Sequence, residues 1–251
     1  MGQELELNVP AIRIVSLVPS QTEFLHALGL EEEVVGITKF CIHPKEWWKS
    51  KKRVGGTKNV DFEKVKALQP DLIIGNKEEN DKENISRLES ICPIWMSDIS
   101  TLEDSYEMML SLGELAGKSS EAKAIVDKIK EGFSQLKPIA AYPKVAYFIW
   151  KKPWMAAGSD TFIHQMLEKC GFQNAVQSTR YPELQENDFP EVDFVFLSSE
   201  PYPFKEQDVN EVEKLFPKAK IVIVDGEYFS WYGSRLLDAP TYFQQLITSL
   251  V

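Results

Sequence analysis

The stretch SSEAKAIVDKIKEGFSQLK, Ser119 to Lys137, decides how the rest of the chain is organised. Apolar residues recur in it at three- and four-residue steps: Ala122, Ile125, Ile129, Phe133 and Leu136. That spacing is typical of one apolar stripe along a helix. Charged residues fill the positions between, Ser119 or Ser120 is expected to cap the start, and Pro138 follows the end. The stretch therefore predicts a one-sided helix near the middle of a chain of 251 residues.

Strand-like and helix-like segments alternate on both sides of this helix. The short apolar, β-branched runs that predict strands are IRIVSLV (12–18), VVGI (34–37), DLIIG (71–75), KVAYFIW (144–150), DFVFLSS (193–199) and KIVIVD (220–225). Each is followed by a segment with helical spacing or by a loop. This alternation predicts an α/β fold of two doubly wound parallel-sheet lobes joined by one long interlobe helix. We expect an N-terminal lobe at 1–117, the bridging helix at 118–138 and a C-terminal lobe at 139–251.

Capping residues predict where several helices begin. Ser20 follows the first strand-like run and is expected to cap the first helix, and Asp61 is expected to cap DFEKVKALQ. Ser159 or Asp160 is expected to cap the helix in SDTFIHQMLEKCG. The segment 38–60 has two tryptophans and no clear period, so it is expected to be a long, ordered loop.

Composition excludes several classes of function. With 43% hydrophobic residues the chain can form real cores, and a net charge of −10 with a pI near 5.0 argues against nucleic acid as a partner. No cluster of Lys and Arg is expected to rise above this acidic background. No apolar run approaches the roughly 18 residues of a membrane span, and the start lacks the pattern of a leader peptide. We expect a soluble, unprocessed protein.

Catalytic and metal-binding motifs are absent from the sequence. The three cysteines and three histidines are scattered, so the cysteines are expected to be buried thiols and no metal site is predicted. Phosphate-binding loops, nucleophile elbows and HExxH are missing. We expect no enzyme activity and no cofactor.

Polar and aromatic residues follow the predicted strands. Pro19 and Ser20 follow the first strand, where a helix N-terminus offers free N–H groups to a ligand. Large rings follow the later strands: Trp150, Trp154, Tyr202, Phe204, Tyr228, Trp231 and Tyr232. These rings are expected either to converge on a cleft or to cap the core of their own lobe. Arg235 is expected to bind a carboxylate or phosphate of a ligand, or to pair with Glu227 or Asp238.

Four segments together resemble one protein family. They are RIVSLVPSQTEFLHALGL with VVGIT, VGGTKNVDFEKVKALQPDLIIG, the helix at 119–137, and DGEYFSWYGSR near the end. The chain resembles the helical-backbone solute-binding proteins of ABC importers, the group that carries cobalamin and ferric siderophores. The resemblance implies a monomeric periplasmic protein with two lobes that move little on binding. It also implies a cleft between the lobes for a small-molecule metal complex, and an ABC permease as partner.

The resemblance assigns roles to individual residues. Ligand-contacting positions of the family fall on Phe40 and on a run near the end of the chain, Glu227, Tyr228, Phe229, Ser230 and Trp231. A tryptophan that packs on the corrin in the family falls on Thr57. The acidic residues that dock onto the permease fall on Glu63 and near Asn187, with Glu186 beside it. Trp150, Trp154 and Arg235 complete the expected ligand site.

Two alternatives stay open at this point. The first is a cytoplasmic carrier of corrinoids or metal complexes without a transporter, which the missing leader pattern favours. The second is an enzyme that uses the same cleft, with Glu200 or Glu227 as general base.

Overall fold

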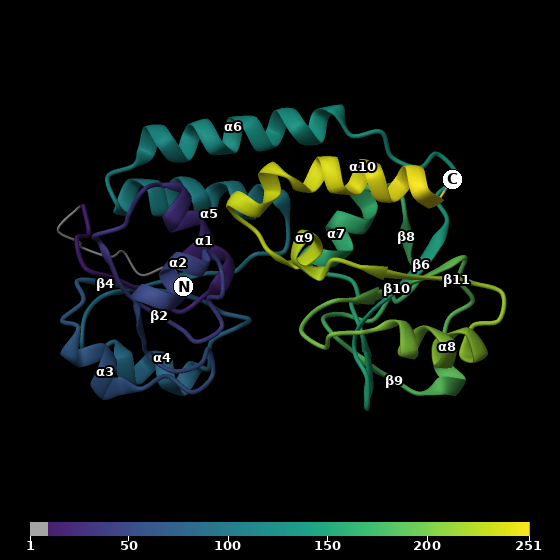
Figure 1. The fold of residues 1–251 in the computed structure, drawn as a ribbon, viewed down its shortest axis with the longest axis horizontal. Coiled ribbons are helices and arrows are strands. Elements are labelled where there is room, and N and C mark those ends of the chain that lie inside the picture. Colours follow the sequence, from purple (N-terminus) through teal and green to yellow (C-terminus); the bar gives the residue numbers. More distant parts are fainter. Residues whose placement is uncertain (1–9, 251) are drawn as a thin grey trace. The chain divides into compact units, whose positions relative to one another are not determined.

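A computed structural model describes residues 10–250, and within them the chain packs as two compact units. Unit 1 contains the described residues up to Ile99, then Glu103–Lys130 and Tyr232–Arg235. Unit 2 contains Ser100–Leu102, Glu131–Trp231 and the described residues from Leu236 onward. The predicted bridging helix is present as α6, Ser119–Gln135, which is continuous across the boundary after Lys130. Figure 1 shows both units and α6.

The sheet of unit 1 is parallel throughout its described strands, as the sequence predicts. Its strands are β1 (Ile14–Ser16), β2 (Val34–Ile37), β3 (Lys52–Arg53), β4 (Leu72–Asn76) and β5 (Ile94–Ser97). They lie in the order β3-β2-β1-β4-β5. The helices along this part of the chain are α1 (Pro19–Ala27), α2 (Lys45–Ser50), α3 (Phe62–Ala67), α4 (Lys82–Leu88) and α5 (Leu102–Leu115). The strand order reverses between β1 and β4, and open α/β sheets bind ligands at such a switch point.

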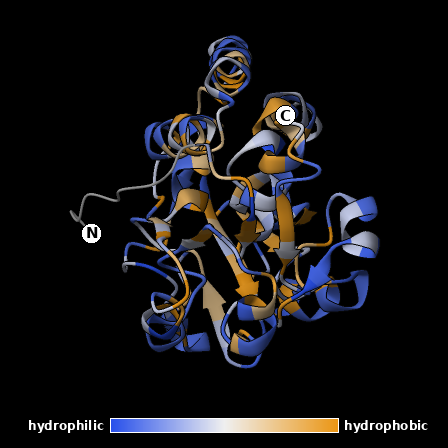
Figure 2. Ribbon diagram, turned by 90° about the vertical axis from the view of Figure 1, so that its left-hand side faces the viewer, coloured by the Kyte–Doolittle hydropathy of each residue, from blue (hydrophilic) through white to orange (hydrophobic). Residues whose placement is uncertain are grey.

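The central strands of unit 1 form its core because a parallel sheet is covered on both faces. All five residues of β4 are buried. Val15, Leu17 and Ile73 are fully buried and belong to one apolar cluster with residues of α3 and α4. Figure 2 shows the apolar colouring of the strands and the mixed colouring of the helices.

The sheet of unit 2 is mixed, which the sequence did not predict. Its strands are β6 (Lys144–Trp150), β7 (Trp154–Ala156), β8 (Gln173–Asn174), β9 (Glu183–Leu184), β10 (Phe194–Ser198) and β11 (Lys220–Val224). The described order is β11-β10-β6-β7-β9, with β8 also pairing with β6. Strands β10, β11 and β8 are parallel to their neighbours, whereas β7 is antiparallel to both β6 and β9. The turn at 151–153 reverses the chain, so a segment expected to be a loop returns along β6.

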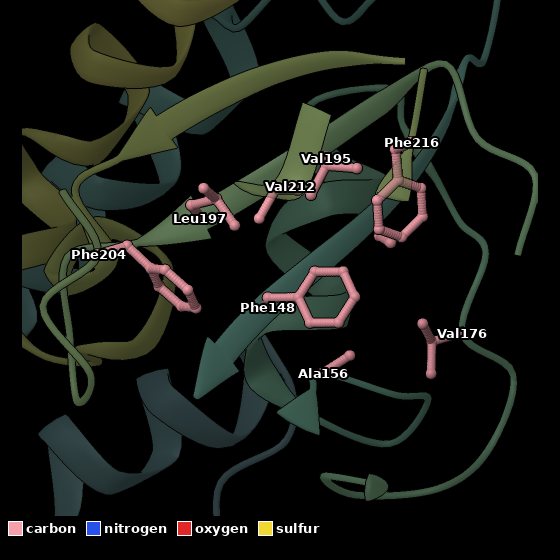
Figure 3. Packing of buried hydrophobic residues seen from close by; sticks show 9 residues of the cluster. Phe148, Ala156, Val176, Val195, Leu197, Phe204, Val212 and Phe216 are labelled. Carbon is pink, nitrogen blue, oxygen red and sulfur yellow. The ribbon is translucent and has the colours of Figure 1, made fainter. Parts of the chain in front are cut away.

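Short and long helices complete unit 2. They are α7 (Phe162–Lys169), η1 (Glu186–Asp188), α8 (Glu206–Leu215), α9 (Gly226–Ser230) and α10 (Ala239–Leu250), with η2 (Ser234–Leu237) spanning a unit boundary. Side chains of β6, β10 and α8 meet in an apolar cluster around Phe148, which Figure 3 shows with Phe204 and Phe216. Phe148 makes an edge contact with Phe216, with ring centroids 5.9 Å apart. This core holds the carboxyl ends of β6 and β10 in place.

Two predicted helix caps are corrected and a third is confirmed. Helix α1 begins at Pro19, not after a Ser20 cap, and its N-cap Val18 makes no side-chain capping bond. Proline is favoured at the first position of a helix because a backbone N–H there has no acceptor within the helix, so proline loses no hydrogen bond by lacking it. Thr161, not Ser159 or Asp160, caps α7 by accepting a hydrogen bond from the His164 N–H. Asp61 caps α3 as predicted, by accepting one from the Lys64 N–H.

The expected loop at 38–60 contains α2 and β3. The side chain of Trp47 in α2 is fully buried, its ring meets that of His26 edge-on at 5.2 Å, and its indole N–H donates to the Glu31 carboxylate. Six residues carry too little periodicity to reveal a helix, so these contacts with other parts of unit 1 stabilise it.

The sequence predicts neither a membrane-spanning helix nor a metal site, and the described residues bear on both predictions. Between residues 10 and 250 no helix combines the length and apolar character required to span a bilayer. The same residues hold no group of three or more His, Cys, Asp or Glu placed to bind a metal ion. Cys41 and Cys170 are buried free thiols, as expected, and Cys92 is half-buried.

Candidate ligand-binding site

The switch point of unit 1 presents the start of α1. Ser20 lies in the first turn and is almost completely buried. Its Oγ has no hydrogen-bond partner among the described residues, and neither has the Oε1 of the neighbouring Gln21. Unmatched polar atoms are rare in protein interiors, which makes this turn a candidate for contacts to a ligand.

A buried chain of amides fixes the loop that carries Thr57. The Nε2 of Gln21 and the Nδ2 of Asn76 donate to the Ser97 hydroxyl at 2.5 and 3.1 Å. Asn80 accepts from the backbone N–H of Asn76 at 2.8 Å and donates from Nδ2 to the carbonyl of Thr57 at 3.1 Å. The Gly55–Thr57 loop is thereby tied to the carboxyl ends of β4 and β5.

Phe40 lies on the loop between β2 and α2, which contacts the Gly55–Thr57 loop. Half of the side chain is exposed, and its ring is so close to Gly56 that a Cβ there would lie 3.1 Å from Cε2 of Phe40. The Lys39 ammonium lies 5.0 Å from the ring centroid, and the Lys39 N–H donates to the Gly55 carbonyl at 2.8 Å. Unit 1 thus places two predicted ligand residues, Phe40 and Thr57, beside one another on a rigid support.

Arg235 pairs with Glu23 on α1. Its Nε and Nη2 donate to the two carboxylate oxygens at 3.2 and 2.6 Å, a bidentate pair. Both side chains are mostly buried, at 16% and 20% exposed. Gly233, with φ of +117°, allows the preceding turn to approach Ser20 and Phe24 closely. The pair therefore fastens residues 232–235 onto α1, and its guanidinium fork is already bound to a carboxylate.

The predicted run at 227–231 forms α9 and its C-cap. Asp225 caps this helix by accepting from the Glu227 N–H at 3.1 Å. Tyr228 stacks on Tyr242 with ring centroids 4.4 Å apart. Phe229 is fully buried and packs at 5.1 Å from the Tyr147 ring, so in this structure it is a core residue.

Ser230 and Trp231 share one carboxylate oxygen. The Ser230 hydroxyl and the Trp231 indole N–H both donate to Oε1 of Glu200, at 2.6 and 2.9 Å. Burial raises the pKa of Glu200, and the nearby carboxylates of Glu227 and Asp225 raise it further. Trp231 itself is only 7% exposed. These contacts make Trp231 a well-anchored ring with little free surface.

The remaining rings of unit 2 form a continuous series of contacts. Trp150, 39% exposed, meets Tyr202 edge-on at 5.6 Å, and Tyr202 meets Phe204 at 4.7 Å. Trp154 lies parallel to Phe204 at 6.3 Å and packs on the apolar core. Trp150 therefore exposes the most surface of the predicted ligand rings of this unit, whereas Trp154 serves its core.

The two residues predicted to dock a permease are both exposed. Glu63 lies in the first turn of α3, and Glu186 begins η1. Glu186 also lines a cavity of about 760 Å³ with Lys144, Phe189 and Asp193. That cavity lies at the amino ends of β6 and β10, the opposite edge from the predicted ligand residues.

Sequence reasoning missed the amide chain and the Glu23–Arg235 pair. Asn76 directly follows four buried residues of β4, and a polar residue at the carboxyl end of a buried strand is a signal that was available. The partners Ser97 and Glu23 carry no such signal because they are distant in sequence from the residues that they contact.

Solved structures share this fold over almost the whole chain. The periplasmic heme-binding protein HutB of Vibrio cholerae matches with a TM-score of 0.80 at 20% identity, covering 94% of this chain and 98% of that one. The periplasmic vitamin B12-binding protein BtuF of the same species matches with a TM-score of 0.74 at 19% identity, covering 96% and 98%. At such identities the likeness concerns the fold alone.

Curated relatives match by sequence. An uncharacterized ABC transporter substrate-binding lipoprotein of Bacillus subtilis is 30% identical over 185 residues, which is 69% of this chain and 58% of the relative. A vitamin B12-binding protein of Vibrio parahaemolyticus is 28% identical over 181 residues, 70% of this chain and 65% of the relative. The matched region thus spans about six-tenths of the length of these relatives. The sequence profile described as periplasmic binding protein matches residues 14–200, three quarters of the chain, so the chain belongs to the periplasmic binding protein family.

Proposed function

We propose that this chain is the substrate-binding protein of an ABC import system and that it binds a metal complex, a corrinoid, a heme-like macrocycle or a ferric siderophore. The observation that carries the proposal is family membership together with the names of the relatives, which are described as vitamin B12-binding and heme-binding proteins. The expectation that the ligand lies between two lobes stays a prediction.

The side chains at the strand ends support a bulky, partly apolar ligand. Phe40 in unit 1 and Trp150 in unit 2 each expose a large ring that is fixed by neighbouring contacts. Rigid aromatic rings offer contact area at a low cost in conformational entropy, which suits a flat or bulky ligand. We assign ligand contacts first to Phe40, Thr57 and Trp150, and then to Ser20 and Tyr228, whereas the buried Trp231 is assigned to the support of unit 2.

We infer that the chain does not catalyse a reaction. Glu200, the buried carboxylate with a raised pKa, already accepts two hydrogen bonds from its own unit. This arrangement favours a structural role for Glu200.

An ABC permease is the partner that this function requires, and Glu63 and Glu186 are proposed to contact it. Both carboxylates are exposed, as docking residues must be. The proposed location is the periplasm, in keeping with the family. Double replacement by glutamine should weaken capture of the purified permease and leave ligand affinity unchanged.

Equilibrium dialysis with cyanocobalamin, hemin, a ferric catecholate and a ferric hydroxamate tests the ligand class. Binding of one of them, with quenching of tryptophan emission, is the expected result. Phe40→Ala should weaken that binding by about 1–2 kcal/mol because an exposed anchor ring is lost. Tyr142→Ala is the matched control. Tyr142 is a 64% exposed ring next to the amino end of β6, whereas the proposed ligand residues lie at the carboxyl ends of strands.

Tryptophan variants locate the quenched ring. Trp150→Phe should remove a large part of the ligand-dependent quenching, whereas Trp48→Phe should not, although both indoles are 39% exposed. Failure of all four ligands to bind would contradict the proposed function. Equal effects of the two tryptophan variants would contradict the assignment of Trp150.

A further inference from the structure

A basic segment interrupts the acidic chain at residues 39–58. It contains seven Lys and Arg residues and one acidic residue, Glu46. The other residues of the chain hold 21 Lys and Arg and 37 Asp and Glu, a net charge of −16. The net charge of the whole chain hides this contrast, so the expectation that no basic cluster stands out is wrong.

Exposed apolar side chains lie in the same segment. Ile42 is 47% exposed and Trp48 is 39% exposed. On α2, Lys45, Trp48 and Lys49 share one face because residues three and four apart are neighbours on a helix. Trp47 is buried on another face of α2, which fixes the direction of the exposed one.

Contacts within unit 1 hold Trp48 in place. Its indole N–H donates to the Lys39 carbonyl at 3.3 Å, so the polar part of the ring has a partner. The Arg53 guanidinium carbon lies 4.8 Å from the ring centroid, and its Nη1 donates to the Trp48 carbonyl at 2.7 Å. These contacts join Arg53 to Trp48 on α2. The exposed side chains of this segment, Ile42, Lys45, Trp48, Lys49, Lys52 and Arg53, are called the basic–aromatic patch.

We propose that the basic–aromatic patch docks this protein onto an anionic lipid surface. Lysine and arginine are attracted to anionic headgroups, and tryptophan favours the boundary between headgroups and acyl chains. The strongly acidic remainder of the chain is repelled by the same surface, so attachment is confined to this patch. Docking does not depend on which ligand is bound.

Lipid fits the patch better than nucleic acid does. Single-stranded nucleic acids are bound by stacking bases on open aromatic faces, but Arg53 already covers a face of Trp48. The bulky aliphatic side chain of Ile42 beside the cations suits an apolar boundary. The charged residues Lys52 and Arg53 on the edge strand β3 also discourage pairing with other strands, but this does not explain the exposed Ile42 and Trp48.

Co-sedimentation with vesicles tests the proposal. The full chain should bind vesicles of about equal parts phosphatidylglycerol and phosphatidylcholine at low salt, and not vesicles of phosphatidylcholine alone. Lys49→Gln with Lys52→Gln should weaken partitioning about fivefold per cation, or roughly 25-fold for the pair. Lys128→Gln with Lys214→Gln is the matched control, because it removes the same charge from exposed lysines elsewhere.

Trp48→Ala separates the ring from the charges. It should lower partitioning severalfold and remove the blue shift of emission that vesicles cause, while thermal melts show that every variant is folded. Equal binding to uncharged vesicles, or equal weakening in the matched control, would overturn the proposal. Equally tight binding to a short single-stranded oligonucleotide would assign the patch to polyanions in general and would also overturn it.

Discussion

Replacing Trp231 by alanine tests whether this ring stabilises unit 2 or forms a platform for the ligand. More than nine-tenths of the side chain is buried, and truncating a buried tryptophan to alanine typically costs about 3–5 kcal/mol. The substitution also removes the indole N–H that Glu200 accepts at 2.9 Å. A hydrogen bond to a charged group contributes about 1.5–3 kcal/mol, part of which overlaps with the first amount. We therefore expect the free energy of unfolding to fall by about 5 kcal/mol.

Thermal melting and calorimetric titration give the two readouts. For a chain of this size, about 2–4 °C of melting temperature is lost per kcal/mol, so Trp231→Ala should melt roughly 10–20 °C lower. Trp231→Phe keeps most of the buried ring and loses the N–H, so about 2 kcal/mol is expected. Ligand affinity, measured below the lowest transition, should change little in either variant.

Trp150→Ala is the matched control for this experiment. Its indole is 39% exposed and meets Tyr202 edge-on, so its loss should cost about 1 kcal/mol of stability but should clearly weaken ligand binding. If Trp231→Ala melts within about 2 °C of the parent and loses affinity, Trp231 is the ligand platform and the reasoning from its burial is refuted.

Three further predictions concern the groups around these sites. Burial raises the pKa of Glu200, so the folded chain keeps the carboxyl proton of Glu200 to higher pH than the unfolded chain. The free energy of unfolding should therefore decline as pH rises from about 4.5 through the raised pKa. Urea titrations of Glu200→Gln should lack this part of the decline. Arg235→Met and Glu23→Gln should each cost about 1–3 kcal/mol, and a double-mutant cycle should give a coupling of similar size; additive effects would contradict the bidentate pair. Asp61→Ala should lower the midpoint of chemical denaturation and Asp61→Ser should lower it much less, because serine also caps helices; equal losses would argue against capping.

The sequence was sufficient for the regular elements with strong patterns. Strand β6 and helix α6 follow from local apolar spacing, and the Asp61 cap follows from a side chain that bonds within its own turn. The parallel sheet of unit 1 follows from the alternation of strands and helices. Each of these depends on interactions within a few residues, or on a period that repeats over many residues.

Elements without such a pattern needed the structure. Helix α2 has six residues and is held by the burial of Trp47, and β7 has three residues and exists because it pairs with β6. Short segments gain little from their own hydrogen bonds, so their conformation depends on partners that lie far away in sequence.

The basic–aromatic patch and the aromatic run at 227–231 show the same division within the candidate sites. The positive charge of residues 39–58 can be counted from the sequence, because composition needs no contacts. Which ring faces solvent cannot be derived from the sequence. Phe229 is fully buried, Trp231 is nearly so and Trp150 is 39% exposed, although all three lie at or after the carboxyl ends of strands of the same sheet. The face on which a ring lies depends on the helix or strand that packs against it, as Tyr147 packs against Phe229. The sequence by itself therefore determined which residue types stand near the strand ends, whereas tertiary packing alone decided which of them remain accessible to a ligand.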